Sequence, residues 1–543
     1  MALCSRLSRG SLLAEANLKT ATLKTATFFM LSLATAWPTM TLAGTHSPTS
    51  RLHEISDPDT RAWWQATQAL SDDAMEGRDT GSPGHDRAAA LVAKRFAEAG
   101  LRPAGDDGSW FQRFRLNDLR VTPKGSRIAV GKTPLRLLYD ITLRPSAGMP
   151  TRLDAPMVFA GYCAADALGD VRGKVVLCYG WRRAGLTTSV QRSGAVEAAG
   201  GVGLITLADP GFTLEPTRWP AAYARTMTPV DAPASAAGRM LVATLNPQAL
   251  AAVIAGTGQD AKQILALGSA GKPLPRFDLS GRFEAQLHLE QRVVTSANVL
   301  GVLPGTDPKL RDQYLVLSAH LDGYGHGEPV DGDGLYNGTL DDAAYVALLE
   351  RLATRRHGKG YRRPVLFAGF TGEEKGLLGS RYFVAHPTVP RRAIAANINL
   401  DQLRPIFPLT RLTVHALDDS TLGDTVRKVA ARDDIVVQLD PEPERNLLRR
   451  ADHWSFVQAG IPATGFVFGY RHGTDAEKRY RHWYDAQYHR PQDDLTQPMN
   501  WPAAGKFNRF FYHLVAAVAD ADAAPQWKPG SPLAPRAGTR ASP

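Results

Sequence analysis

The chain has 543 residues, of which 44% are apolar and 21% charged, and its formal charge is +10. This composition excludes a disordered or fibrous chain and is typical of a globular protein of about two to four domains. Much of the excess charge lies at the two ends, in residues 1–43 and in the tail after residue 524. No basic run interleaves with aromatic side chains, so we expect no nucleic-acid partner.

Residues 1–43 predict a secretory signal peptide. Basic side chains precede the apolar stretch ATFFMLSLATAW, and small residues follow at 41–43, where a signal peptidase would cut. The apolar stretch is shorter than the roughly 20 residues that span a bilayer, and no later segment is a candidate span. We therefore expect an exported chain, periplasmic or secreted, without a stable membrane span after cleavage.

Two cysteines remain once the predicted signal peptide, which contains Cys4, is removed. Cys163 and Cys178 both occur in strand-like stretches, GYCAA and KVVLCYG. In an oxidising compartment one disulfide would fit this pattern, and two separately buried thiols fit it equally well. Stability is not expected to rest on a disulfide framework.

The pattern of elements divides the rest of the chain into four regions. Residues 48–139 begin with the helical stretches RAWWQATQAL and RAAALVAKRFAEAG and form an N-terminal segment of the main domain. Residues 140–285 change to short β-runs and turns, which indicates an inserted β-rich domain. Residues 293–523 alternate strands and helices, which predicts an α/β fold with a mostly parallel central sheet flanked by helices. The proline-rich residues 524–543 are expected to be disordered.

Several strand ends and loops of this α/β region carry side chains that can bind metal. Taken singly, each has a structural explanation, such as helix N-capping by Asp341 and Asp342 or a surface turn at the adjacent glutamates. Together they supply two imidazoles and three carboxylates: His320, Asp341, Glu374, Asp401 and His489. With one aspartate bridging, this set can hold two zinc ions and leave a position for water, as in an open catalytic site. The carboxylate of Asp322 lies two residues after His320, a spacing suited to orienting its ring.

The chain resembles the family 28 zinc metallopeptidases, the co-catalytic di-zinc aminopeptidases and their relatives. The motifs that carry the resemblance occur in order along the chain: EGRDTGSPG at 76–84, His-x-Asp at 320–322, an aspartate before a helix at 341, EEKGLLGS at 373–380, Asn-x-Asp at 399–401 and YHRP at 488–491. Within the insert, GKVVLC, AVEAAG and VGLITLAD resemble a protease-associated domain. The resemblance covers most of the mature chain and is specific as a set of motifs.

The resemblance implies a role for each matching metal-binding residue. His320 and Asp401 would hold one zinc ion, Glu374 and His489 would hold the other, and Asp341 would bridge the two. Cobalt or manganese would also suit carboxylate and imidazole ligands.

Three further residues receive catalytic roles from the resemblance. Asp322 would orient His320, and Glu373 would be the general base that takes a proton from water activated by the two cations. Tyr488 would stabilise the tetrahedral intermediate with its hydroxyl group, and a packed aromatic side chain explains this residue equally well.

The sequence departs from the family pattern beside the bridging aspartate. Asp342 stands where the family usually has asparagine, so it adds negative charge and could compete as the bridge. Tyr345 stands where the family has a small residue and could narrow the pocket. Asp452 and His453 also match the family, either as a satisfied loop pair or as substrate contacts.

These observations predict an exported metalloexopeptidase that acts on peptides or proteins, most commonly in this family as an aminopeptidase. A carboxypeptidase or dipeptidase on the same scaffold stays open, as does a glutaminyl cyclase, which resembles this fold but uses one zinc ion. A receptor-like binding module is the third class, and retention of all five ligands disfavours it. The sequence does not indicate the oligomeric state.

Overall fold

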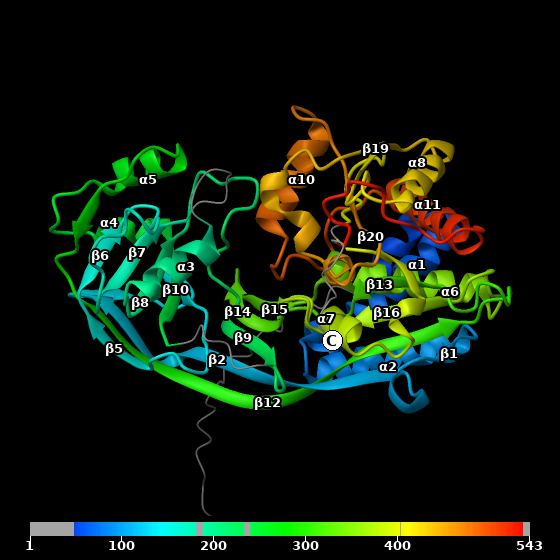
Figure 1. The fold of residues 1–543 in the computed structure, drawn as a ribbon, viewed down its shortest axis with the longest axis horizontal. Coiled ribbons are helices and arrows are strands. Elements are labelled where there is room, and N and C mark those ends of the chain that lie inside the picture. The colour runs from blue at the N-terminus through cyan, green and yellow to red at the C-terminus, as the bar shows by residue number, and fades with distance from the viewer. Residues whose placement is uncertain (1–47, 181–187, 233–238, 402, 536–543) are drawn as a thin grey trace, which may run out of the picture. The chain divides into compact units, whose positions relative to one another are not determined.

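The computed structural model describes residues 48–180, 188–232, 239–401 and 403–535 (Figure 1). The predicted signal peptide lies outside these residues, and its assignment stays a prediction. Among the described helices, none combines the length and apolar character needed to cross a bilayer.

The central sheet has ten strands, and seven of them follow one another in the order β20-β17-β13-β16-β12-β2-β3. In that order their bounds are Ala463–Thr464, Ile394–Asn399, Tyr314–His320, Val365–Phe370, Phe283–Leu303, Phe111–Val130 and Thr133–Leu135. Three shorter strands pair with the two long ones: β1 (Arg102–Pro103) and β5 (Arg152–Ala155) with β12, and β9 (Ala224–Pro229) with β2. The first four run parallel, whereas the pairs made by β12 and β2 are antiparallel. The predicted α/β fold is confirmed, with parallel pairing limited to the half that carries the predicted ligands.

The burial of the strands explains why parallel pairing is limited to one half of the central sheet. β13 and β16 are apolar and buried on both faces, as parallel strands between two layers of helices require. Much of β12 alternates between buried and exposed residues, because one face of the antiparallel ribbon meets water.

Helices cover both faces of the parallel strands. Because side chains alternate along a strand, Leu315 and Leu317 of β13 face one core and Val316 faces the other. The first core is covered by α1 (Pro58–Leu70), α2 (Pro83–Glu98), α6 (Ala344–Arg356), α8 (Thr421–Arg432) and α11 (Trp501–Ala519), and the second by α7 (Leu378–Ala385) and α9 (His453–Gln458).

A small separate sheet consists of β18 (Arg411–Val414), β19 (Val436–Gln438) and β21 (Phe466–Phe468). The helix α10 (Asp475–Ala486) precedes the loop to His489.

The region predicted as an insert carries a second sheet and its own core. Its strands follow the order β11 (Arg276–Asp278), β6 (Met157–Ala160), β7 (Val175–Tyr179), β8 (Gly203–Leu207), β10 (Leu241–Leu245) and β4 (Ile141–Leu143), with helices α3 (Ser189–Ala198), α4 (Leu250–Val253) and α5 (Ala261–Ser269). Cys163 and Cys178 form a disulfide within it. The likeness to a protease-associated domain stays a prediction.

The long strands β2 and β12 connect this second sheet to the central one. They pair antiparallel along most of their length, and both contribute side chains to the core of the insert as well as to the central sheet. β9 belongs by sequence to the insert, but it pairs with β2 in the central sheet. Part of the inserted chain therefore returns towards the parallel strands.

The expectation that residues 524–543 are disordered is wrong for the part that the structure describes, 524–535. The indole N–H of Trp527 donates to the carbonyl of Gly460 at 2.8 Å, and the Lys528 ammonium pairs with Asp424 at 2.7 Å. Trp527 also packs against the core beneath α7 and α9. Proline-rich composition did not prevent ordering, because one aromatic anchor and backbone hydrogen bonds hold the segment.

Replacing this anchor tests the packed tail. We expect Trp527→Ala to lower the free energy of unfolding by about 1–3 kcal/mol, because it removes partly buried aromatic surface and leaves a carbonyl without its donor. Urea unfolding of the full chain measures the change. Gln526→Ala is the matched control, since Gln526 is exposed and pairs with Thr421 through its backbone. Equal stability of both variants would contradict the packed tail.

Candidate active site

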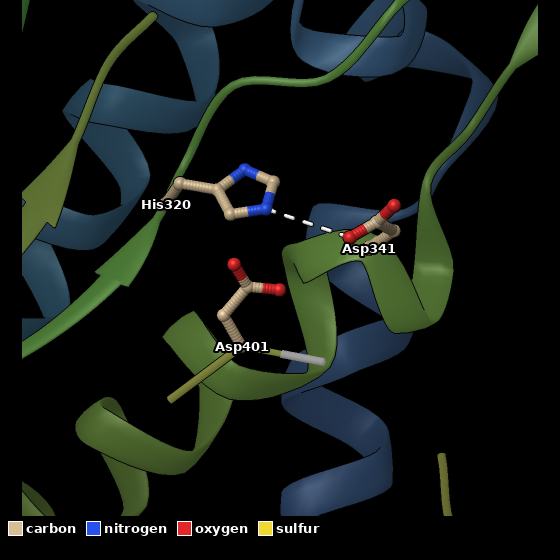
Figure 2. Close-up of side chains that lie close together, drawn as sticks. All are labelled: His320, Asp341 and Asp401. Atoms are coloured by element: carbon tan, nitrogen blue, oxygen red, sulfur yellow. Dashed lines mark ion pairs between the residues drawn. The ribbon is translucent and has the colours of Figure 1, made fainter. Parts of the chain in front are cut away.

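The predicted ligands converge at the carboxyl ends of the parallel strands, where ligands bind in open α/β sheets. His320 ends β13, Glu374 lies in the loop after β16, and Asp401 follows β17. Asp341 lies before α6, and His489 lies in the loop after α10. Figure 2 shows the side chains of His320, Asp341 and Asp401 pointing towards a common space.

Asp341 lies between two groups of ligand atoms. One of its carboxylate oxygens is 3.5 Å from Nε2 of His320, and the other is 3.3 Å from Nε2 of His489. The same nitrogen of His489 is 3.2 Å from Glu374. The ligand atoms of His320, Asp341 and Asp401 lie within 4.8 Å of one another, as do those of Asp341, Glu374 and His489. The five predicted ligands therefore form two triads that share one carboxylate.

The donor atoms of this site fit divalent cations. Nε2 of His320 and Oδ2 of Asp341 are buried and have no hydrogen-bond partner among the described residues. Buried polar atoms are rarely left unpaired, and imidazole nitrogens and carboxylate oxygens are good ligands for such ions. A cation in each triad would satisfy these atoms and offset the charge of the carboxylates.

The alternative in which Asp341 and Asp342 cap a helix is excluded. α6 begins at Ala344, and its N-cap residue is Ala343, which makes no side-chain capping bond. The Asp342 carboxylate instead accepts a hydrogen bond from the backbone N–H of His320 at 3.1 Å. The peptide bond between the two aspartates is cis. Asp341, and not Asp342, holds the shared position between the triads.

Arg404 is a charged partner of Asp341 that the sequence did not single out. The guanidinium group is fully buried, donates to Asp341 at 3.1 Å, and also donates to the carbonyls of Leu340 and Leu403. Burial by itself would raise the pKa of Asp341, but Arg404, His320 and His489 together hold it well below its usual value. The shared carboxylate is therefore kept ionised. The available sequence signal was a basic residue three positions after Asp401.

Asp322 contacts His320 differently from the prediction. Nδ1 of His320 lies 3.0 Å from the backbone carbonyl of Asp322 and 3.8 Å from its carboxylate. The carboxylate accepts hydrogen bonds from the Thr80 hydroxyl and from the backbone N–H of Glu373, both at 3.0 Å. The expectation that this carboxylate holds the imidazole is corrected, because those two donors occupy it. Asp322 orients His320 through its main chain and the Glu373 loop through its side chain.

The adjacent glutamates have different surroundings. Glu374 faces His489, whereas Glu373 lies in a group with His320. Burial raises the pKa of Glu373 well above its usual value, and the nearby carboxylates of Asp401 and Glu374 add to this effect while His320 opposes it. A simple surface turn does not explain this pair, because both side chains are largely buried among ionisable groups.

Two tyrosines contact His489, and one of them was missed in the sequence. The hydroxyl of Tyr324 lies 2.8 Å from Nδ1 of His489, which leaves Nε2 to face Asp341 and Glu374. The ring of Tyr488 stacks on His489 with centroids 3.7 Å apart, and its hydroxyl accepts a hydrogen bond from Arg450 at 3.3 Å. Only its position in the sequence, four residues after His320, could have pointed to Tyr324.

The EGRDTGSPG motif supports the site from outside. The buried guanidinium group of Arg78 donates to four backbone carbonyls, those of Leu70, Leu321, Asn337 and Gly338. These bonds fix the loops that follow His320 and precede Asp341. Gly77 has a positive φ of 61°, and a Cβ there would lie 2.3 Å from the carbonyl of Tyr336. Only glycine fits this close approach.

The pocket lining includes none of Tyr345, Asp452 and His453. Tyr345 points into the core, where its hydroxyl donates to the carbonyl of Leu403 at 3.0 Å, so it does not narrow the site. His453 faces His415, with ring centroids 5.0 Å apart, and it is not hydrogen-bonded to Asp452. Asp452 is buried near the triads, and burial raises its pKa to about 7.

A small pocket, with a cavity volume of about 10 Å³, lies beside the shared carboxylate. Its lining combines aromatic, acidic and basic side chains: Tyr324, Tyr336, Gly338, Asp341, Glu374, His489, Arg490 and Asp493. Tyr336 and Tyr324 come from the β14 (Gly325–Val330) and β15 (Asp333–Tyr336) hairpin and the residue before it. The pocket therefore adjoins the triad of Asp341, Glu374 and His489.

Comparisons with known proteins agree with this geometry. Residues 298–515, which include all five predicted ligands, match the family model described as peptidase family M28. Over these residues the chain is similar to peptidase family M28. Among curated relatives, leupeptin-inactivating enzyme 1 of Streptomyces exfoliatus is 28% identical over 211 residues, 37% of this chain and 44% of the relative. A probable leucine aminopeptidase 2 of Aspergillus oryzae is 25% identical over 276 residues, 48% and 51% of the two chains. The chain spans about half the length of these curated relatives.

Solved structures share the fold of this chain. An aminopeptidase from Aneurinibacillus sp. strain AM-1 matches with a TM-score of 0.57 at 17% identity, covering 86% of this chain and 94% of that one. BSAP, a zinc aminopeptidase from Bacillus subtilis, matches with a TM-score of 0.55 at 18% identity, covering 84% and 94%. The arrangement of the central sheet is therefore that of known aminopeptidase structures.

The contact between Tyr324 and His489 gives a prediction for metal binding. Groups that hold the second ring nitrogen of a ligand histidine typically change metal affinity 10- to 100-fold. We expect Tyr324→Phe to weaken binding of Co²⁺ to the metal-free protein about tenfold, measured from the visible absorption of the bound ion. Tyr336→Phe is the control, because its hydroxyl donates to the carbonyl of Glu328 and not to a ligand. Unchanged affinity in Tyr324→Phe would contradict this role.

Proposed function

We propose that this protein is an exported di-zinc metalloexopeptidase of peptidase family M28, and specifically an aminopeptidase. The observation that carries the proposal is the pair of ligand triads that share Asp341. Buried ligand atoms in them have no hydrogen-bond partner among the described residues, and a pocket and the separate, half-buried carboxylate of Glu373 lie beside them. The named activities of the relatives support the substrate class. The predicted signal peptide and the disulfide between Cys163 and Cys178 support export, since disulfides persist in oxidising compartments.

The donor set assigns the metal ligands. His320 and Asp401 would hold one zinc ion, Glu374 and His489 the other, and Asp341 both. Bound zinc would supply Lewis-acid polarisation of the substrate carbonyl and would lower the pKa of water at the site. The complete set supports a two-ion peptidase over a single-zinc glutaminyl cyclase or a binding module.

The protein's own residues then handle the proton and the developing charge. Glu373 accepts a proton from the attacking water and passes it to the departing amine, and its raised pKa suits a group that must carry the proton between these steps. The Asp322 carboxylate holds the backbone of Glu373 in place. The Tyr488 hydroxyl donates to the oxygen on which negative charge develops.

The charged lining of the pocket supports binding of a chain terminus. The carboxylate of Asp493 lines the pocket and suits an N-terminal amine. Arg490 also lines it, but its guanidinium group donates to the carbonyls of Trp219 and Pro220. An aminopeptidase is therefore favoured over a carboxypeptidase on the same scaffold.

Metal content tests the two-ion assignment. We expect two zinc ions per chain in the purified mature protein, and about one in Asp401→Ala, with hydrolysis of an aminoacyl 4-nitroanilide lost in step. Elemental analysis measures the ions, and Asp312→Ala is the control because Asp312 is exposed and remote from the ligands. One ion or none in the unmutated protein would contradict the two-metal proposal.

The adjacent glutamates give contrasting variants. Because Glu373 moves a proton, Glu373→Gln should keep both zinc ions and lower kcat about 10²- to 10⁴-fold. Because Glu374 is a ligand, Glu374→Gln should lower the zinc content instead. Steady-state kinetics and metal analysis of the two proteins measure these effects. Full activity in Glu373→Gln would exclude it as the general base.

A further inference from the structure

A segment of the insert lies directly against the loop that carries Tyr488. Residues 212–220 follow β8 and lead into β9. The Arg218 guanidinium donates to the carbonyl of Tyr484 at 2.6 Å, and Arg490 donates to the carbonyls of Trp219 and Pro220 at 3.0 and 3.2 Å. These bonds join the insert to the end of α10 and to the loop containing His489.

Within this segment, Glu215 is buried and pairs with Arg450 through both carboxylate oxygens. Arg445, which is also buried, lies 3.9 Å from the same carboxylate. Arg450 in turn donates to the hydroxyl oxygen of Tyr488. A chain of contacts therefore leads from the insert through one guanidinium group to Tyr488.

The insert also contacts the ring of Tyr488. The guanidinium carbon of Arg218 lies 4.5 Å from the ring centroid, and the ring packs on His489. A cation near an aromatic ring is attracted to it, most strongly when both are desolvated. Arg218 of the insert therefore contacts the ring of Tyr488. Arg450, which pairs with Glu215 of the insert, holds the hydroxyl.

The direction of the Arg450 hydrogen bond has a chemical consequence. A tyrosine hydroxyl can accept and donate at the same time, and Arg450 can only donate. Since Arg450 occupies an acceptor position, the O–H of Tyr488 stays available to donate to another group. A guanidinium group this close to buried side chains needs a negative partner, and Glu215 supplies it.

We propose that Glu215 of the insert is a positioning residue that holds Arg450 so that the Tyr488 hydroxyl is aimed at the substrate oxygen. The inserted segment thereby completes the catalytic site of the M28 domain. This inference rests on the proposed function, because hydrolysis is the step that the positioned Tyr488 hydroxyl would assist.

Kinetics of the zinc-loaded full chain test this role. We expect Glu215→Gln to lower kcat for an aminoacyl 4-nitroanilide about tenfold and to leave KM within about twofold and the zinc content unchanged, since the lost interaction acts in the transition state. Glu215→Asp, which keeps the charge, should recover part of the loss. Asp154→Asn is the matched control, because this carboxylate of the insert pairs with Arg282 at an exposed surface.

A double mutant separates positioning from simple support of the fold. If Glu215 acts through Tyr488, then Glu215→Gln should have no further effect on kcat in a Tyr488→Phe background. An equal loss in both backgrounds, or no loss in the single variant, would overturn the inference while leaving the peptidase proposal intact.

A measurement that needs no catalysis keeps the two proposals apart. With 3-fluorotyrosine at position 488, the fluorine resonance should shift in Glu215→Gln and stay in place in Asp154→Asn. If the unmutated chain hydrolyses no aminoacyl anilide or peptide, the proposed function fails and this spectrum alone decides whether Glu215 positions Tyr488. An unshifted resonance would overturn the inference.

Discussion

The crowding of buried carboxylates at one edge of the sheet is the constraint that organises this protein. The buried Asp341 and Asp401 and the two half-buried adjacent glutamates gather around a space that also receives two imidazoles. Ionised carboxylates cannot be buried together without compensating charge. Arg404 supplies part of that charge by pairing with Asp341, and the unpaired donor atoms of the two triads define where cations would supply the rest.

Around these ligands, the protein uses groups from distant parts of the chain to fix each orientation. Arg78 ties down the loops on either side of the site through four backbone carbonyls, Asp322 holds the main chain of Glu373, and Tyr324 occupies the second nitrogen of His489. Such support matters because a ligand displaced by even a small distance loses its geometry. The motif at 76–84 therefore has a structural role, which is to hold the loops of the site, and takes no direct part in the chemistry.

The insert is connected to the site more closely than a separate module would be. β2 and β12 continue from the central sheet into the insert, and residues 212–220 return to contact α10 and the His489 loop. A loop that reaches an active site from an insertion can change independently of the metal ligands. This arrangement places the contacts around Tyr488 and the candidate metal ligands on different parts of the chain.

The sequence by itself determined the α/β class, the parallel strands and the five candidate ligands, because apolar runs ending in His320 or Asp401 follow local rules of strand burial. Adjacent carboxylates also pointed to a cation without any structure. Only the tertiary structure decided that Asp341 and not Asp342 is shared, that Asp322 contacts His320 through its carbonyl, and that residues 524–535 pack. It also revealed Arg404, Tyr324 and Glu215. These depend on contacts between residues far apart in the chain, and such contacts leave no periodic trace in the sequence.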